Sequence, residues 1–339
     1  GHLDPAFLTL LDEVQSSLRS LFRTENEMTF PISGTGSAGM EACLHNLVEE
    51  GDEVIVGVNG VFGTRLAELA GRLGADVRRV EADWGNTIDP ETVAAALASC
   101  RRPSLVAVIH AETSTGAWQP IEDISTLAHE AGALLLVDTV TSLGGCPVEV
   151  DRWGIDASYS GTQKCLSCPP GLSPVTFSRR AMEKVASRRT PVRTWYFDLG
   201  LIGAYLGGER VYHHTAPVSM IYALSEALAL VEEEGLEARF ERHRSNHELL
   251  IEGAASLGLE PFVAEGKRLW MLNSITVPGS LDEAALRRSL LERHGIEIGP
   301  GLGPLAGRLW RVGLMGETSR QANVERFLAC LDEELRSAC

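Results

Sequence analysis

The sequence lacks an excess of basic residues. It has 30 Lys and Arg against 46 Asp and Glu, which gives a formal net charge of −16 at pH 7. A surface of this sign repels the phosphates of nucleic acids and anionic lipids, so we expect neither to be the main partner. A small anionic ligand stays compatible, because a pocket can be locally positive on an acidic protein.

Long hydrophobic runs are missing as well. No stretch of 18 apolar residues occurs, and apolar stretches such as Ala131–Val137 have only the length of a strand. We therefore expect no membrane span. The 339 residues, 44% of them hydrophobic and 22% charged, are typical of a globular protein of about two domains.

The cysteines form no disulfide pattern. There are seven, an odd number scattered over a long chain, which favours a reducing compartment, and we expect the cytoplasm. Cys165 and Cys168 form a C-x-x-C pair, but no second C-x-x-C and no H-x₃-H is present to complete a zinc site. We therefore expect no metal.

Strand-like and helix-like segments alternate along the first two-thirds of the chain. The predicted strands are Glu53–Val58, Asp76–Val80, Leu105–His110 and Leu134–Asp138. The predicted helices are Thr64–Leu73, Pro90–Ser99, Ile121–Ala131, Val218–Glu234 and Leu236–His247. Continuous apolar strands separated by helices indicate an α/β fold, with a mainly parallel sheet covered by helices on both faces.

The pattern changes after about residue 240. The predicted elements there are a strand at Leu269–Val277, a helix at Asp282–His294, a strand at Leu309–Leu314 and a helix at Ser319–Arg336. We therefore predict a large domain over residues 1–240 and a small α+β domain over residues 241–339.

Three segments carry chemistry. Lys164 follows the polar turn Ser160–Gln163 and precedes small and apolar residues, a setting that can lower a lysine pKa and make the amine nucleophilic. Asp138 closes a buried strand at the sheet edge where ligands bind. Residues Ser33–Glu41 form a Gly- and Ser-rich turn into a helix, which suits a phosphate. The alternatives are a solvated lysine, a helix-capping Asp and an ordinary helix start.

The order of the motifs is more specific than any one of them. The motifs are Gly34–Ser37, Asn59–Gly63, His110–Gly116, Val137–Ser142, Ser160–Lys164, Tyr212–Pro217 and Arg311–Gly316. In this order the chain resembles the class V aminotransferases of fold type I, which depend on pyridoxal 5′-phosphate (PLP). Within them it is most similar to the alanine–glyoxylate and serine–pyruvate aminotransferases. The resemblance implies a seven-stranded, mainly parallel sheet between helices.

The resemblance also implies roles around the cofactor ring. Lys164 matches the lysine that holds PLP as a Schiff base and shuttles the substrate's proton. Asp138 matches the residue that pairs with the pyridinium nitrogen, which keeps the ring an electron sink. Phe62 matches an aromatic that stacks on the ring, with a core aromatic as the alternative. Val140 matches the residue on the opposite face, and Thr113 a hydroxyl near O3′.

The phosphate of the cofactor has its own implied partners. Thr35, Gly36 and Ser37 match the phosphate-binding turn, and Gln163 matches a side-chain donor to the same group. The phosphate end of the site would therefore be formed by two separate segments of the chain.

Tyr212 and Thr215 resemble residues that reach the phosphate from a second subunit, so the resemblance implies a homodimer with shared active sites. His213 and His214 are structural in our interpretation, since adjacent side chains are expected to point apart. Arg311 matches the arginine that binds the substrate α-carboxylate as a bidentate pair, with a surface ion pair as the alternative.

The implied reaction is ping-pong transamination between a small amino acid, alanine or serine, and glyoxylate or pyruvate. The alternatives are a 2-aminoethylphosphonate–pyruvate transaminase, a class V lyase such as a cysteine desulfurase, and a protein that binds without turnover. The lyase is disfavoured, because Cys330 falls in the predicted last helix and Cys339 is the last residue. Family members also carry a Pro-Gly-Pro-type segment before the point where this sequence begins, so we expect its substrate contacts to lie outside the sequence.

Overall fold

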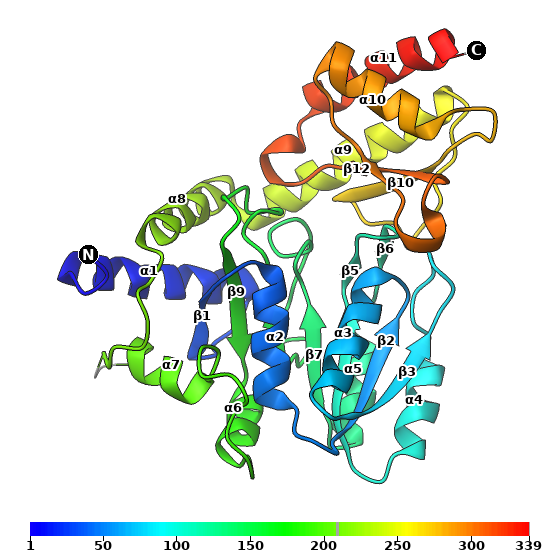
Figure 1. The fold of residues 1–339 in the computed structure, drawn as a ribbon. Coiled ribbons are helices and arrows are strands. Elements are labelled where there is room, and N and C mark those ends of the chain that lie inside the picture. The colour runs from blue at the N-terminus through cyan, green and yellow to red at the C-terminus, as the bar shows by residue number, and fades with distance from the viewer. Residues whose placement is uncertain (208–209, 339) are drawn as a thin grey trace.

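A seven-stranded sheet is the centre of the computed structural model, which describes residues 1–207 and 210–338 (Figure 1). In sheet order the strands are β1 (Met28–Ser33), β9 (Leu172–Phe177), β8 (Ala157–Tyr159), β7 (Leu134–Asp138), β4 (Pro103–Ile109), β2 (Glu53–Val58) and β3 (Asp76–Glu81). Only β9 runs antiparallel to its neighbours, β1 and β8, and the other neighbouring pairs are parallel. The predicted mainly parallel sheet is confirmed.

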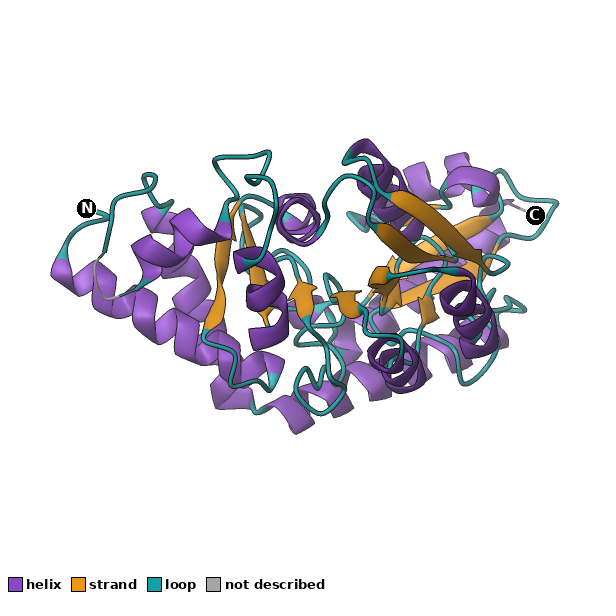
Figure 2. Cartoon of the chain, turned by 90° about the horizontal axis from the view of Figure 1, so that it is seen from below, coloured by secondary structure: helices purple, strands orange, loops and turns teal. Residues whose placement is uncertain are grey.

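Helices cover both faces of this sheet, as Figure 2 shows. On one face lie α1 (Pro5–Phe22), α4 (Pro90–Ser99), α5 (Glu122–Glu130) and α8 (Val218–Glu234). On the other face lie α2 (Gly36–Leu47), α3 (Val61–Arg72), α6 (Arg179–Ala186) and α7 (Leu199–Leu206). The central strands β4 and β7 therefore have apolar residues on both sides. The five residues of β7, for example, are all buried.

A smaller antiparallel sheet follows in the last third of the chain. Its strands, in sheet order, are β10 (Leu272–Thr276), β12 (Leu309–Gly313) and β11 (Gly299–Pro300). It packs with α9 (Leu236–Ser256), α10 (Glu283–His294) and α11 (Gln321–Ala338) around a separate apolar cluster. The two-stranded sheet of β5 (Ala111–Glu112) and β6 (Ala117–Trp118) lies beside this part in Figure 1. The boundary at residue 240 stays a prediction, and it falls inside the continuous helix α9.

Three strands of the large sheet were not predicted from the sequence. In β1 and β9 each strand carries a proline, and Pro31 lies directly opposite Pro174 in the antiparallel register. A proline has no N–H for the ladder, so it argues against a strand unless the strand is at an edge or irregular. The third strand, β8, has only three residues. The helix α9 also extends beyond the predicted end at His247.

No helix within residues 1–207 and 210–338 combines the length and the apolar character that crossing a bilayer requires.

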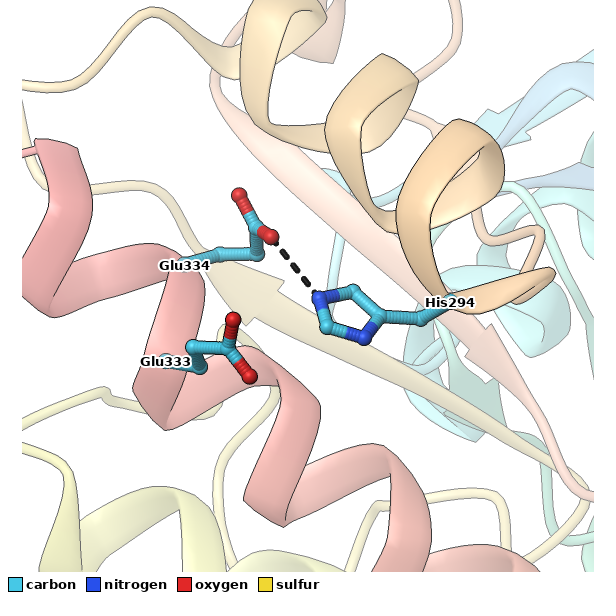
Figure 3. A group of neighbouring side chains, drawn as sticks. All are labelled: His294, Glu333 and Glu334. Atoms are coloured by element: carbon cyan, nitrogen blue, oxygen red, sulfur yellow. Dashed lines mark hydrogen bonds and ion pairs between the residues drawn. The ribbon is translucent and has the colours of Figure 1, made fainter.

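One group of His and Glu side chains joins α10 to α11 (Figure 3). His294, Glu333 and Glu334 approach one another closely enough to hold a metal ion. However, Arg293 already pairs with both glutamates, and His294 Nε2 lies 2.8 Å from Glu334 Oε1. We interpret the group as a network of ion pairs that ties the two helices together.

Candidate active site

A cavity of about 200 Å³ opens at the carboxyl ends of the parallel strands. Its lining residues come from the first turns of α2 and α3, from β5 and the residue after it, and from the ends of β7 and β8 with the segments that follow them: Thr35, Gly36, Ser37, Met40, Phe62, Arg65, Ala111, Thr113, Asp138, Val140, Thr141, Tyr159, Gln163 and Lys164. Nine of the twelve predicted site residues are in this set, and the other three are Arg311, Tyr212 and Thr215. Segments from five parts of the sequence therefore meet at one edge of the sheet.

The start of α2 forms one end of the cavity. Thr35 is the N-cap residue, but its side chain accepts no hydrogen bond from the helix. The first N–H groups of a helix have no partner within it, and they carry the positive end of the helix dipole. Gly36 is buried, and a Cβ there would lie 3.1 Å from Val140 Cγ2. This end therefore favours an anionic group held by backbone N–H groups.

Asp138 ends β7 on the same face of the sheet as α2. Its carboxylate is buried, and burial raises its pKa to about 7, although Tyr159 and the backbone N–H of Val140 lower it in part. The Val140 N–H donates to Asp138 Oδ1 over 2.8 Å. Tyr159 lies directly opposite Asp138 in the β7–β8 register, and its buried hydroxyl is near enough to the carboxylate to lower that pKa, although the two groups do not meet the geometry of a hydrogen bond. A buried carboxylate of this kind favours a cationic partner.

Lys164 lies half-buried in the cavity. Burial lowers the pKa of its amine, and the positive charge of Arg311 lowers it further. The backbone after Lys164 is held firmly, since the Cys165 carbonyl accepts a hydrogen bond from Arg239 and Cys165 Sγ donates to Thr141 O over 3.0 Å. A lysine with a lowered pKa on a fixed backbone can act as a nucleophile or a base.

Phe62 forms a wall of the cavity at the start of α3. The guanidinium of Arg65 lies 5.3 Å from the centre of its ring, a cation–π distance. The backbone N–H of Phe62 donates to the buried carboxylate of Glu112 over 3.1 Å. Sequence reasoning assigned no role to Arg65, Glu112 or Tyr159. Glu112 lies within the His110–Gly116 motif, but nothing in the sequence shows which backbone groups its carboxylate meets.

Arg311 reaches the edge of the cavity from β12 in the small sheet. Its guanidinium donates to two backbone carbonyls, Pro300 O at 2.7 Å and Thr113 O at 3.1 Å. Burial lowers its pKa from the ordinary arginine value. Both of these partners are neutral, so the positive charge of Arg311 stays available for an anion close to Lys164.

Tyr212 and Thr215 do not line the cavity. Both are exposed, and the two hydroxyls lie 3.4 Å apart. The expectation that His213 and His214 point apart is wrong, because their Nδ1 atoms approach to 2.7 Å. The segment has no regular secondary structure, so the alternation expected of neighbours does not apply. His214 Nε2 continues this chain of contacts to Ser33 Oγ, at 2.9 Å.

The chain is similar to known proteins over nearly its whole length. Residues 1–306 match the family model for class V aminotransferases. The (S)-ureidoglycine–glyoxylate transaminase of Bacillus subtilis is 40% identical, over 99% of this chain and 85% of the relative. The alanine–glyoxylate aminotransferase of Drosophila melanogaster is 39% identical, over 100% of this chain and 87% of the relative. The crystal structure of an alanine–glyoxylate aminotransferase from Nostoc sp. superposes with a TM-score of 0.97 at 52% identity, covering 99% and 89% of the two chains.

Proposed function

This chain belongs to the class V aminotransferases, and we propose that it binds PLP on Lys164 and transfers amino groups between a small amino acid and glyoxylate or pyruvate. The observation that carries the proposal is the cavity itself. It combines a half-buried amine of lowered pKa, a buried carboxylate and an uncapped helix start.

The chemistry of these groups fits PLP. The N–H groups at Thr35–Ser37, with Gln163 beside them, suit its phosphate. The Asp138 carboxylate suits a protonated ring nitrogen, since a cation would offset the cost of ionising a buried acid. The Lys164 amine suits its aldehyde carbon. When bound, PLP supplies the electron sink that transamination needs.

The side chains around the cofactor would bind the substrate and move its proton. Arg311 would bind the α-carboxylate of the amino acid, and the same contact would accept the keto acid in the second half-reaction. Lys164 Nζ would take the proton from the α-carbon and return it, since its lowered pKa leaves a lone pair available. Asp138 would hold a proton shared with the ring nitrogen. Phe62 and Val140 would exclude water from the two faces of the ring.

The choice of donor rests on the names of relatives. The Bacillus and Drosophila proteins are named for ureidoglycine and alanine as donors, and both for glyoxylate as acceptor. We therefore propose glyoxylate as an acceptor, with alanine and ureidoglycine as candidate donors, and we add serine because of the sequence resemblance. A desulfurase would need a reactive thiol, but Cys165 beside Lys164 is fully buried and burial raises its pKa to about 12. Cys330 lies on α11, and Cys339 is outside the described residues.

We further propose a homodimer that shares its active sites. The support is the exposed position of Tyr212 and Thr215 in a segment that also exposes Val211 and whose His213 stacks on the exposed ring of Trp195. Large apolar side chains that are exposed together on a protein surface are typical of a contact between subunits. Free cysteines throughout the described chain support the cytoplasm as the compartment.

A donor–acceptor screen tests the proposed function. Purified protein is incubated with PLP, one donor (alanine, serine, ureidoglycine or 2-aminoethylphosphonate) and glyoxylate or pyruvate, and the keto and amino products are quantified. We expect turnover with alanine, serine or ureidoglycine and glyoxylate, and none in the Lys164→Ala variant. Turnover only with 2-aminoethylphosphonate would favour that transaminase instead. Normal PLP binding without turnover for any pair would favour a binding protein.

A further inference from the structure

Glu112 is a buried carboxylate that none of the roles above uses. It is 0% exposed, and it accepts four hydrogen bonds. Oε2 receives the backbone N–H groups of Phe62 (3.1 Å) and Gly63 (3.2 Å). Oε1 receives the backbone N–H of Ser114 (3.1 Å) and its hydroxyl (2.5 Å). Each oxygen of the carboxylate is therefore used twice.

These contacts provide the cap that α3 otherwise lacks. Its N-cap residue is Gly60, which has no side chain to accept the first N–H groups. Glu112 accepts two of them, and Ser114 Oγ accepts a third, that of Val61, over 2.9 Å. A Cβ at Gly60 would lie 2.4 Å from both Glu112 Cδ and Ser114 Oγ, so glycine is needed for this close approach. The capping group thus comes from the β5 segment, about fifty residues later in the chain.

The same carboxylate lies between two other parts of the cavity. Thr113, the next residue, lines the cavity and offers its carbonyl to Arg311. Glu112 is close enough to Arg311 to favour the charged guanidinium. Glu112 is thus hydrogen-bonded to the backbone of Phe62, and it is next in sequence to Thr113, whose carbonyl holds Arg311.

We propose that Glu112 is a positioning residue, which fixes the Phe62 wall and the Thr113–Arg311 contact so that the cavity is formed before the cofactor enters. This rests on the proposed function. A preformed wall removes the cost of ordering Phe62 when PLP binds, so the contribution of Glu112 is expected in the affinity for the cofactor.

The charge and both oxygens of Glu112 are needed for this role. In Glu112→Gln the size is kept, but one oxygen becomes an NH₂ group, which cannot accept a hydrogen bond. The NH₂ group would then face either the N–H groups of Phe62 and Gly63 or the backbone N–H of Ser114, whose hydroxyl can turn and accept. The rest of the cavity, including Lys164, stays chemically unchanged.

The test measures the dissociation constant of PLP by equilibrium dialysis, in the full chain, for wild type, E112Q, F62A and the double variant. E112Q should weaken PLP binding by about tenfold, the effect of losing hydrogen bonds to a charged group. In the F62A background, adding E112Q should raise the PLP dissociation constant by less than about twofold, because the aromatic wall that Glu112 positions is gone.

Glu49→Gln is the matched control. Glu49 is also buried, and it also accepts two backbone N–H groups and a hydroxyl, those of Arg189 and Thr190, but it lies away from the cavity. E49Q likewise removes the charge of a buried carboxylate, but outside the cavity, and it should leave the PLP dissociation constant unchanged. A merely structural Glu112 would give the result of E49Q.

Two results would overturn the role of Glu112: a PLP dissociation constant for E112Q equal to that of wild type, or an equal loss with and without Phe62. If wild type itself bound no PLP, the proposed function would fail first, and this proposal with it. Should E112Q not fold, Ser114→Ala carries the same test. It should raise the dissociation constant by about threefold and speed amide exchange at Val61, and an unchanged constant would refute the role.

Discussion

Replacing Asp138 by Asn should stabilise the cofactor-free protein at alkaline pH while it removes transaminase activity. The pKa of Asp138 is about 7 in the fold against 3.8 for an ordinary aspartate, because the carboxylate is buried. The folded state therefore keeps a proton that the unfolded state has lost, and stability falls as the pH rises from about 4 to 7. The asparagine has no proton to lose, so it escapes this penalty.

The magnitude follows from the pKa. Each pH unit between the two pKa values costs about 1.4 kcal/mol, so the full cost of ionising Asp138 is about 4 kcal/mol. Most of it, about 3 kcal/mol, falls between pH 5 and pH 8. The assay is urea unfolding of wild type and D138N without PLP at both values. The free energy of unfolding of wild type, relative to D138N, should drop by about 3 kcal/mol from pH 5 to pH 8.

Glu49→Gln again supplies the control. Burial alone would raise the pKa of Glu49, but hydrogen bonds from Thr190 and Arg189 outweigh burial and lower it from the ordinary glutamate value. Glu49 is therefore ionised at both pH values, and the difference between E49Q and wild type should not change between them. If the difference in unfolding free energy between D138N and wild type were also the same at pH 5 and pH 8, Asp138 would already be ionised in the cofactor-free fold. That result would refute the reasoning.

Three further changes test other parts of the site. Arg311→Lys should raise KM for the amino donor by about tenfold or more, since a lysine cannot form the bidentate pair, and an unchanged KM in steady-state kinetics would argue against carboxylate binding there. Tyr212→Phe together with Thr215→Ala should weaken PLP binding by about tenfold without changing the thermal midpoint of the cofactor-free protein, and equal affinity by dialysis would remove these residues from the phosphate site. Tyr159→Phe should move the pH dependence attributed to Asp138 to higher pH, because the lost hydroxyl lowers that pKa; an unmoved midpoint in the same urea experiment would contradict this.

The parts of the fold that were predictable from the sequence are those with a single clear local signal. The strands at Glu53–Val58 and Leu134–Asp138 and the helices at Pro90–Ser99 and Val218–Glu234 have the predicted bounds. Their apolar residues follow one period, and their ends carry capping residues or turns, such as Asp89 before α4 and Gly235 after α8. In β1 and β9 a proline gives a local signal against a strand. Both segments form strands nevertheless, because pairing with the rest of the sheet overrides the local preference.

Site residues were predictable from the sequence where the residue type and its immediate sequence neighbours indicate the chemistry. Lys164, Asp138 and the turn at Thr35–Ser37 all line one cavity. The contributions of Glu112 and Tyr159 depend on which backbone and side-chain groups lie opposite them, and this is set by tertiary packing. The pairing of His213 with His214 was missed for the same reason.

The attachment of PLP to Lys164 is the central claim, and it can be measured directly. The protein is loaded with PLP and reduced with borohydride, which makes a bond between a lysine and the cofactor permanent, and the modified peptide is identified by mass spectrometry. We predict the phosphopyridoxyl group on Lys164 in wild type and no label in Lys164→Ala. Labelling of Lys184 or Lys267 instead, or no labelling at all, would contradict it.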